Sequence, residues 1–245
     1  MIRGVFFDLG GTLRICDPLP WHQAAARTRM AELAGAADPE AFLREIDARY
    51  ESGYRKWALG ENRECGDYEL WAKWLLPELG EEKLRGICHE MTYQYRQVKG
   101  LRRVVEGGYE VIRALRERGF KLGILSNLIG EAEIYDWLRR DRLADSFDAV
   151  VLSSVCHIRK PDPEMYWMGC RELGLEPGEC ASVADNLSRD ITGARRAGIG
   201  ANILFISPEK LATKTLTEEN RPDYIVHRFM DVLDLPILQK AGEGV

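Results

Sequence analysis

Short apolar runs alternate with helical patterns through the second half of the chain, and this alternation constrains the fold more than any other feature. The runs expected to be strands are residues 120–125, 147–152, 181–184, 203–206 and a short 224–226. The helices expected among them are residues 104–118, 131–140, 163–173 and 191–197. Units of strand, helix and strand form right-handed crossovers in a parallel sheet. The pattern therefore predicts an α/β fold.

One more strand is expected near the N-terminus, at residues 5–7, where an apolar run ends at Asp8. Between it and the other strands lies a long block with helical patterning throughout. We therefore predict a Rossmann-like, doubly wound parallel sheet core made of residues 1–16 and 100–245. Residues 17–99 are expected to form an inserted all-helical cap domain. An insertion directly after the Asp8 loop would cover the carboxyl edge of the sheet as a lid.

The helical block carries its own start signals and its own apolar residues. Asp38 followed by Pro39 is typical of a helix N-cap with proline in the first turn. An aromatic stripe is expected to form the core of the cap: Tyr50, Trp57, Trp71 and Trp74. Three basic residues, Arg55, Lys56 and Arg63, are candidates for the mouth of a cleft, although a solvated helix face is the simpler explanation.

Charge and cysteine content exclude several classes of function. The net charge is −5 and no block of like charge occurs, which argues against binding to nucleic acid or an anionic membrane. No apolar stretch approaches the length of a transmembrane helix, and the apolar run before Asp8 is too short for a signal peptide. The six cysteines form no metal-like spacing, so free thiols in a reducing cytoplasm are expected. The sequence does not indicate the oligomeric state.

Polar side chains follow four of the expected strands at the point where each strand ends. The first strand is followed by Asp8, the next by Ser126 and Asn127, the third by Lys160, and the fourth by Asp185 and Asp190. The carboxyl ends of parallel strands share one edge, so these groups should converge there. Carboxylates suit Mg²⁺, a carboxylate can attack phosphorus, and Lys, Ser and Asn donors can neutralise phosphoryl oxygens. The set predicts metal-assisted phosphoryl transfer.

The same residues carry a resemblance to a known family, which covers essentially the whole chain. Residues 8–13, DLGGTL, resemble the motif DxDGT[LV], and residues 124–127, ILSN, resemble the second motif of that family. Residues 160–163, KPDP, resemble the third motif, and residues 183–198 resemble the fourth, GDxxxxDxxGAxxAG. Four motifs in this order identify the chain as similar to the haloacid dehalogenase superfamily, in its phosphatase-like branch with a helical cap of the C1 type.

The resemblance implies roles for the residues at the strand ends. Asp8 would be the nucleophile and Lys160 its charge-neutralising partner in catalysis. Ser126, Asn127 and Lys160 would bind phosphate. The implied cofactor is Mg²⁺, held by Asp8, the carbonyl of Gly10 and Asp185. Asp190 would either bind the metal itself or orient a metal-bound water or Lys160. The expected substrate is a small phosphate ester.

One departure from the family pattern affects the chemistry. The phosphatases of the family carry an aspartate two residues after the nucleophile as general acid and base, and Gly10 stands there instead. General acid–base help is typically worth 10²–10⁴-fold in rate. Asp17 is the nearest candidate in sequence for a replacement, and a solvated residue at the cap hinge is the alternative. A smaller departure is Ala184, where the family usually has glycine.

Three functions remain open from the sequence. The first is an Mg²⁺-dependent phosphatase that forms an aspartyl phosphate on Asp8 and that the missing acid at Gly10 is expected to slow. The second is a phosphate-binding protein of the same fold without turnover. The third is a 2-haloacid dehalogenase, which Gly10 and the paired Asp185 and Asp190 disfavour.

Overall fold

The first strand, β1 (Gly4–Phe7), lies in the middle of a six-stranded parallel sheet, and all four of its residues are buried. Continuous burial is typical of a parallel strand that is covered on both faces. The strands follow the order β5-β4-β1-β6-β7-β8. Their bounds are β4 Lys121–Ser126, β5 Ala149–Leu152, β6 Cys180–Ala184, β7 Ala201–Phe205 and β8 Tyr224–Val226. The predicted Rossmann-like α/β core is confirmed.

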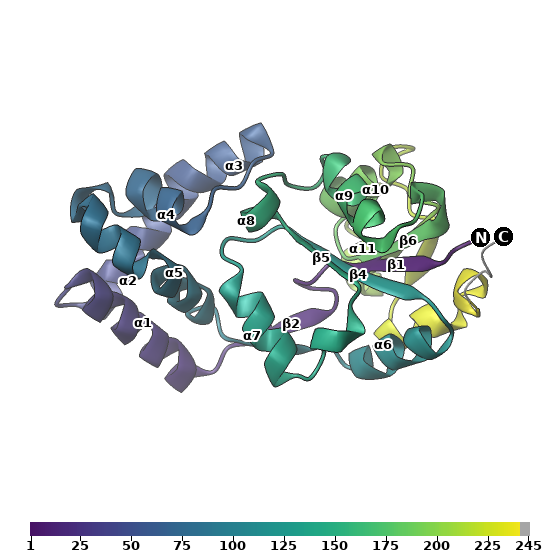
Figure 1. Ribbon diagram of the computed structural model, residues 1–245, viewed down its shortest axis with the longest axis horizontal. Helices are drawn as coiled ribbons and strands as arrows, with labels where there is room; N and C mark the ends of the chain where they lie inside the picture. The colour runs from purple at the N-terminus through teal and green to yellow at the C-terminus, as the bar shows by residue number, and fades with distance from the viewer. Residues whose placement is uncertain (241–245) are drawn as a thin grey trace.

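Helices cover both faces of this sheet (Figure 1). Neighbouring residues of β1 point to opposite faces: Phe7 packs in one apolar cluster and Phe6 in another. The Phe7 cluster includes residues of α6 (Gly108–Glu117), α7 (Ala132–Arg140) and the 3₁₀ helix Phe229–Asp234. The Phe6 cluster includes residues of α9 (Glu164–Leu173) and α10 (Thr192–Arg196). Shorter helices complete the core: α8 Ser153–Cys156, α11 Pro208–Leu211, 3₁₀ turns Ala144–Ser146, Pro177–Glu179 and Pro236–Leu238, and the π-helical turn Leu187–Ile191. The computed structural model describes residues 1–240.

The inserted block folds as helices that gather beyond one end of the sheet (Figure 1). They are α1 Pro20–Ala34, α2 Pro39–Arg49, α3 Arg55–Glu61, α4 Asp67–Glu69 and α5 Glu81–Gln97, joined by π-helical turns at Tyr50–Tyr54 and Leu70–Leu75 and a 3₁₀ turn at Pro77–Leu79. Asp38 caps α2 by accepting from the backbone N–H of Glu40 at 2.9 Å and of Ala41 at 3.1 Å. The predicted aromatic stripe packs in the core of this block, where Trp71 is fully buried.

An antiparallel pair of short strands, which the sequence analysis did not anticipate, lies where the chain enters and leaves the helical block. Strand β2 (Arg14–Asp17) pairs with β3 (Leu101–Val104). The predicted helix at 104–118 was therefore wrong at its start, because Val104 ends β3 and α6 begins only at Gly108. The partner strand is far away in the sequence, so local periodicity could not reveal the pairing. The pair holds the helical block against the core next to the Asp8 loop.

No helix among residues 1–240 is long and apolar enough to cross a membrane.

Candidate active site

Asp8 lies directly after β1, at the carboxyl edge of the sheet. Its backbone N–H donates to the carbonyl of Val183 in β6 at 3.0 Å, which extends the parallel ladder by one residue. The following residues turn back at once, since the N–H of Arg14 donates to the carbonyl of Leu9 at 2.7 Å. This turn leaves the Asp8 carboxylate buried at the end of the strand.

Lys160 reaches Asp8 from the loop that precedes α9. Its Nζ lies 2.6 Å from Asp8 Oδ1, 2.6 Å from Asp190 Oδ1 and 2.6 Å from the carbonyl of Leu125. Asn127 holds this loop in place, because its side-chain amide donates to the carbonyl of Lys160 and accepts from its N–H, each at 2.8 Å. The Asn127 side chain, expected to bind phosphate, is thus engaged with the backbone that positions Lys160.

Three carboxylates meet beside Lys160. Ligand oxygens of Asp8, Asp185 and Asp190 all lie within 4.8 Å of one another. Burial raises the pKa of Asp8, and the ammonium of Lys160 opposes that rise. Burial, followed by repulsion from Asp8 and Asp190, raises the pKa of Asp185 to about 6. The buried carboxylates therefore repel one another, and nearby positive charge relieves that repulsion.

Arg189 is a part of this site that the sequence analysis missed. Its Nη2 donates to Asp190 Oδ2 at 2.8 Å and lies 3.7 Å from Asp8 Oδ2 and 3.6 Å from Asp185 Oδ1. Burial opposes its charge, but the carboxylates of Asp190 and Asp8 outweigh burial and raise its pKa. Its position between Asp185 and Asp190 in the fourth motif was the available signal. Asp190 thus pairs with two cations, since Lys160 Nζ lies at its Oδ1 and Arg189 Nη2 at its Oδ2.

The residues present fit a divalent cation between Asp8 and Asp185. Asp8 Oδ2 and Asp185 Oδ1 are buried and have no hydrogen-bond partner within residues 1–240. Hard carboxylate oxygens left in this state suit Mg²⁺. Gly11 helps to bring them together, because it adopts φ +84° and a Cβ there would lie 2.3 Å from Asp185 Oδ2. Only glycine allows the loop to approach Asp185 so closely.

A small cavity of about 200 Å³ lies next to this cluster. Gly10, Gly11, Ser126 and Asn127 line one part of it, and residues of β2 and β3 together with Arg96 of α5 line another. Gly10 leaves open space, since nothing lies within 4 Å of where its Cβ would be. Asp17, the candidate replacement for the missing acid, pairs instead with Arg103 on the neighbouring strand and is not among the residues that line the cavity.

A buried ion cluster connects the cavity to α7. Glu133 Oε1 pairs with Arg14 Nη1 at 2.8 Å, and its Oε2 pairs with Arg96 Nη2 at 3.0 Å. Arg102 Nε lies 3.9 Å from Glu133 Oε1. Burial alone would raise the pKa of Glu133, but Arg96, Arg14 and Arg102 outweigh burial and lower it to about 2. The ionised carboxylate therefore stabilises the junction between the sheet and the helical block.

Replacing Glu133 with glutamine should lower the free energy of unfolding by about 3 kcal/mol at pH 7, because the folded-state pKa lies well below the ordinary value of 4.5. This contribution is complete above pH 4.5 and is lost as the pH falls toward the folded-state pKa of about 2. Urea unfolding of both proteins from pH 7 to pH 3 should show the deficit shrinking in acid. The matched change Glu131→Gln, at an exposed position, should cost less than about 0.5 kcal/mol. A deficit independent of pH would contradict this electrostatic role.

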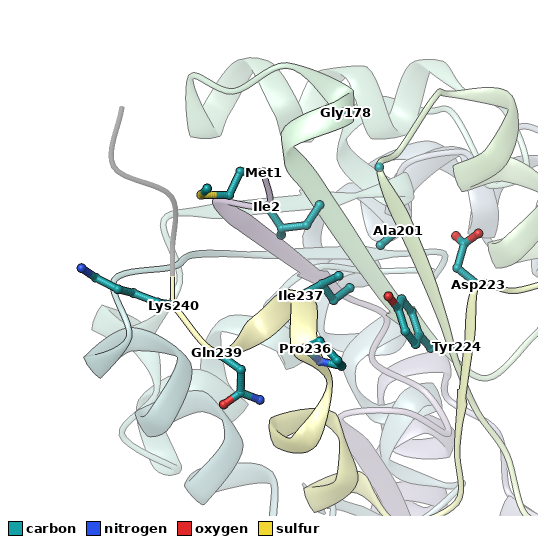
Figure 2. Close-up of a pocket in the computed structure, with 11 residues that line it drawn as sticks. Met1, Ile2, Gly178, Ala201, Asp223, Tyr224, Pro236, Ile237, Gln239 and Lys240 are labelled. Atoms are coloured by element: carbon teal, nitrogen blue, oxygen red, sulfur yellow. The ribbon is translucent and has the colours of Figure 1, made fainter. Parts of the chain in front are cut away.

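A larger cavity, about 920 Å³, lies at the opposite edge of the sheet. Figure 2 shows Met1 and Ile2 before β1, Ala201 at the start of β7, and Pro236 and Ile237 around it. None of the residues at the carboxyl ends of the strands lines this cavity. Size alone therefore does not identify the candidate active site, because the carboxylate cluster lies at the other edge of the sheet.

Comparisons with known proteins agree with this geometry. Residues 2–198 match the family described as haloacid dehalogenase-like hydrolase. "Haloacid dehalogenase-like hydrolase domain-containing protein 3" of Bos taurus is 33% identical over 217 residues, covering 86% of this chain and 84% of that protein. "Glyceraldehyde 3-phosphate phosphatase" of Methanopyrus kandleri is 31% identical over 123 residues, or 49% of this chain and 51% of that protein. The match thus spans about half the length of this second relative.

A solved structure shows the same fold. "2-Haloacid Dehalogenase" from Pseudomonas syringae pv. Tomato DC3000 superposes with a TM-score of 0.64 at 22% identity, covering 98% of this chain and 99% of that one. At this identity the likeness establishes the architecture and leaves the reaction to the residues of the site. The family match over residues 2–198, the bovine relative and this shared fold together place the chain among the haloacid dehalogenase-like hydrolases.

Proposed function

We propose that this hydrolase is an Mg²⁺-dependent phosphatase that acts on small phosphate esters through an aspartyl phosphate on Asp8. The observation that carries the proposal is the pairing of Asp8 Oδ1 with Lys160 Nζ at 2.6 Å, while Asp8 Oδ2 and the nearby Asp185 Oδ1 have no hydrogen-bond partner within residues 1–240. This is a carboxylate held ready to react beside a place for a cation. The similarity to a protein named glyceraldehyde 3-phosphate phosphatase supports the same reaction class.

Different residues of the chain would carry out different parts of the reaction. An oxygen of Asp8 forms a bond to phosphorus as the bond to the leaving oxygen breaks, and the leaving group departs with the electron pair. Lys160 pairs with Asp8, and Ser126 ends the neighbouring strand β4. The ammonium of Lys160 and the hydroxyl of Ser126 would stabilise charge on the phosphoryl oxygens. Water then attacks phosphorus, the bond to Asp8 breaks, and phosphate leaves. Asn127 and Asp190 position Lys160 throughout.

The metal would be held by Asp8, the carbonyl of Gly10 and Asp185, and Asp190 would act behind them through Lys160 and Arg189. When bound, Mg²⁺ supplies charge that stabilises the phosphoryl group in the transition state. Arg189 Nη2 already lies within 3.7 Å of Asp8 Oδ2 and Asp185 Oδ1, so its side chain is next to the place that the metal would take. We therefore expect the guanidinium of Arg189 to offset the repulsion between the carboxylates until the metal binds.

Metal dependence separates the proposed phosphatase from the alternatives. Phosphate release from p-nitrophenyl phosphate should require Mg²⁺ and should stop with EDTA. Asp185→Asn should weaken Mg²⁺ activation by roughly 10- to 100-fold, because it removes one charged ligand. The control Asp223→Asn, at the opposite edge of the sheet, should leave the activation curve unchanged. A dehalogenase would release halide from a 2-haloacid without Mg²⁺, and a binding protein would release neither product.

The proposed setting is the cytoplasm. All six cysteines are free thiols, including Cys170 and Cys180, whose sulfurs lie 3.8 Å apart without a bond. Free thiols at this distance are the usual state in a reducing compartment. A small phosphorylated metabolite is the partner that the cavity beside Asp8 would accept.

A further inference from the structure

At its end toward the helical block, the cavity beside Asp8 is lined by positively charged side chains. Its charged lining residues are three arginines, Arg14, Arg96 and Arg102, and no aspartate or glutamate lines it. Its opposite part is lined by Gly10, Gly11, Ser126 and Asn127, where the phosphoryl group would bind. One small molecule in this cavity would therefore touch both the phosphoryl site and the arginines.

These arginines are parts of the fold with little access to solvent. The side chains of Arg14, Arg96 and Arg102 are 3%, 19% and 12% exposed. They come from three separate places: Arg14 from β2, Arg96 from the last turn of α5 and Arg102 from β3. Arg102 Nη1 is held by the carbonyls of Arg96 at 2.8 Å and of Gly100 at 2.6 Å. The positive charges are thus fixed in position at the cavity wall.

The positive charge of this cluster is not balanced by the protein. Glu133 is the single carboxylate paired with all three arginines, so the cluster keeps a net charge of plus two among these four side chains. Arg14 Nε is buried and has no hydrogen-bond partner in the described chain. Burial and the neighbouring charge of Arg96 lower the pKa of Arg102, which shows that the two guanidinium groups repel each other. An anion bound between them would relieve this repulsion.

We propose that the substrate carries a second anionic group, a carboxylate or a further phosphate, that Arg96 and Arg102 bind while its scissile phosphoryl group lies against Asp8. This inference rests on the proposed phosphatase function and narrows its substrate class. The volume of about 200 Å³ equals roughly the share of seven water molecules in the liquid, so the linker between the two anions is short. Arg14 positions the pair through Glu133, which it shares with Arg96.

The test compares aryl phosphates that differ in one substituent. Phenyl phosphate is the neutral reference, 3-carboxyphenyl phosphate and 1,3-phenylene bisphosphate carry the two candidate anions, and 3-(aminomethyl)phenyl phosphate carries a cation. The natural protein should favour one of the anionic compounds over phenyl phosphate by roughly 10- to 100-fold in kcat/KM, mainly through KM, as expected for hydrogen bonds to a charged group. The preferred compound identifies the anion. The cationic compound should be the poorest substrate.

Arginine variants assign the preference to the cluster. Arg96→Gln and Arg102→Gln should each lose most of the preference for the anionic compound, measured within each variant as the ratio of its kcat/KM to that of phenyl phosphate. Arg103→Gln is the matched control, because Arg103 is the neighbour of Arg102 on β3 but is 54% exposed and pairs with Asp17. It should keep the full preference.

An inhibition measurement on the natural protein tests the inference even if the arginine variants fail to fold. Where 3-carboxyphenyl phosphate is the preferred compound, benzoate should inhibit hydrolysis of phenyl phosphate competitively, and the uncharged benzamide should not; equal inhibition by the two would overturn the inference. Equal kcat/KM for neutral and anionic compounds, or a preference that survives both arginine variants, would also overturn it. Absence of any Mg²⁺-dependent hydrolysis of phenyl phosphate would instead overturn the proposed function itself.

Discussion

Asp8→Asn should abolish phosphate release, with a loss of up to roughly 10⁶-fold in kcat, the size found when a covalent nucleophile is removed from an enzyme. The amide nitrogen and oxygen of asparagine cannot form the acyl phosphate, although the side chain has nearly the same shape. The fold should survive, because the change removes one of three crowded carboxylates from a buried site. The thermal midpoint should therefore be unchanged or higher. Steady-state phosphate release and thermal unfolding measure the two effects.

The matched control for this variant is Asp145→Asn, at an exposed position in the 3₁₀ turn Ala144–Ser146. It makes the same chemical change away from the cluster and should retain full activity. An Asp8→Asn protein with substantial turnover, after contaminating phosphatase has been excluded with a second preparation, would show that another residue attacks phosphorus.

Gly10→Asp should raise the hydrolysis of alkyl phosphates by roughly 10²–10⁴-fold, the usual value of general acid–base help. An alkyl alcohol is a poor leaving group and needs a proton, whereas aryl and acyl phosphates leave as stabilised anions. The natural protein should therefore prefer aryl or acyl phosphates and turn over slowly. The loop has room for the new side chain, because nothing lies within 4 Å of a Cβ at Gly10. The measurement is kcat/KM across esters of graded leaving-group pKa, before and after the change.

Gly10→Asn provides the control for this experiment, since asparagine fills the same space without an acidic proton. It should leave the steep dependence on leaving-group pKa as it is, while Gly10→Asp flattens it. If the natural protein hydrolyses alkyl and aryl phosphates equally well with chemistry limiting the rate, another group delivers the proton. Asp17→Asn would then be the next variant, although Asp17 pairs with Arg103 in the structure.

The cluster around Asp8 was predictable because its members follow strands. In a parallel sheet the strand ends share an edge, so Asp8, Lys160 and Asp185 could be brought together from their positions in the sequence alone. The structure places Lys160 Nζ 2.6 Å from Asp8 Oδ1, at that edge. The sequence analysis did not identify Arg189 as a site residue, because a basic residue inside an acidic motif resembles any solvated surface residue until its neighbours are known.

The arginine cluster could not be predicted for a different reason. Glu133 is separated from Arg14 by 119 residues and from Arg96 by 37, and each looks like an ordinary polar residue of its own element. The unexpected pairing of β2 with β3 brings Arg14 and Arg102 into the same place. The basic residues that the sequence did suggest for the cleft are all exposed, and Arg55 pairs with Glu51 on its own helical turn. The structure therefore supports the simpler explanation, that these basic residues lie on a solvated face.

The covalent intermediate on Asp8 is the central claim, and intact-mass measurement tests it most directly. Enzyme mixed with Mg²⁺ and an aryl phosphate, then quenched in acid within the first turnover, should gain the mass of one phosphoryl group. The intermediate should accumulate, because Gly10 leaves its hydrolysis without a general base. Peptide mapping should place the group on Asp8, and hydroxylamine should remove it. Phosphate release with no labelled enzyme at any quench time, or a label on a residue other than Asp8, would contradict the account.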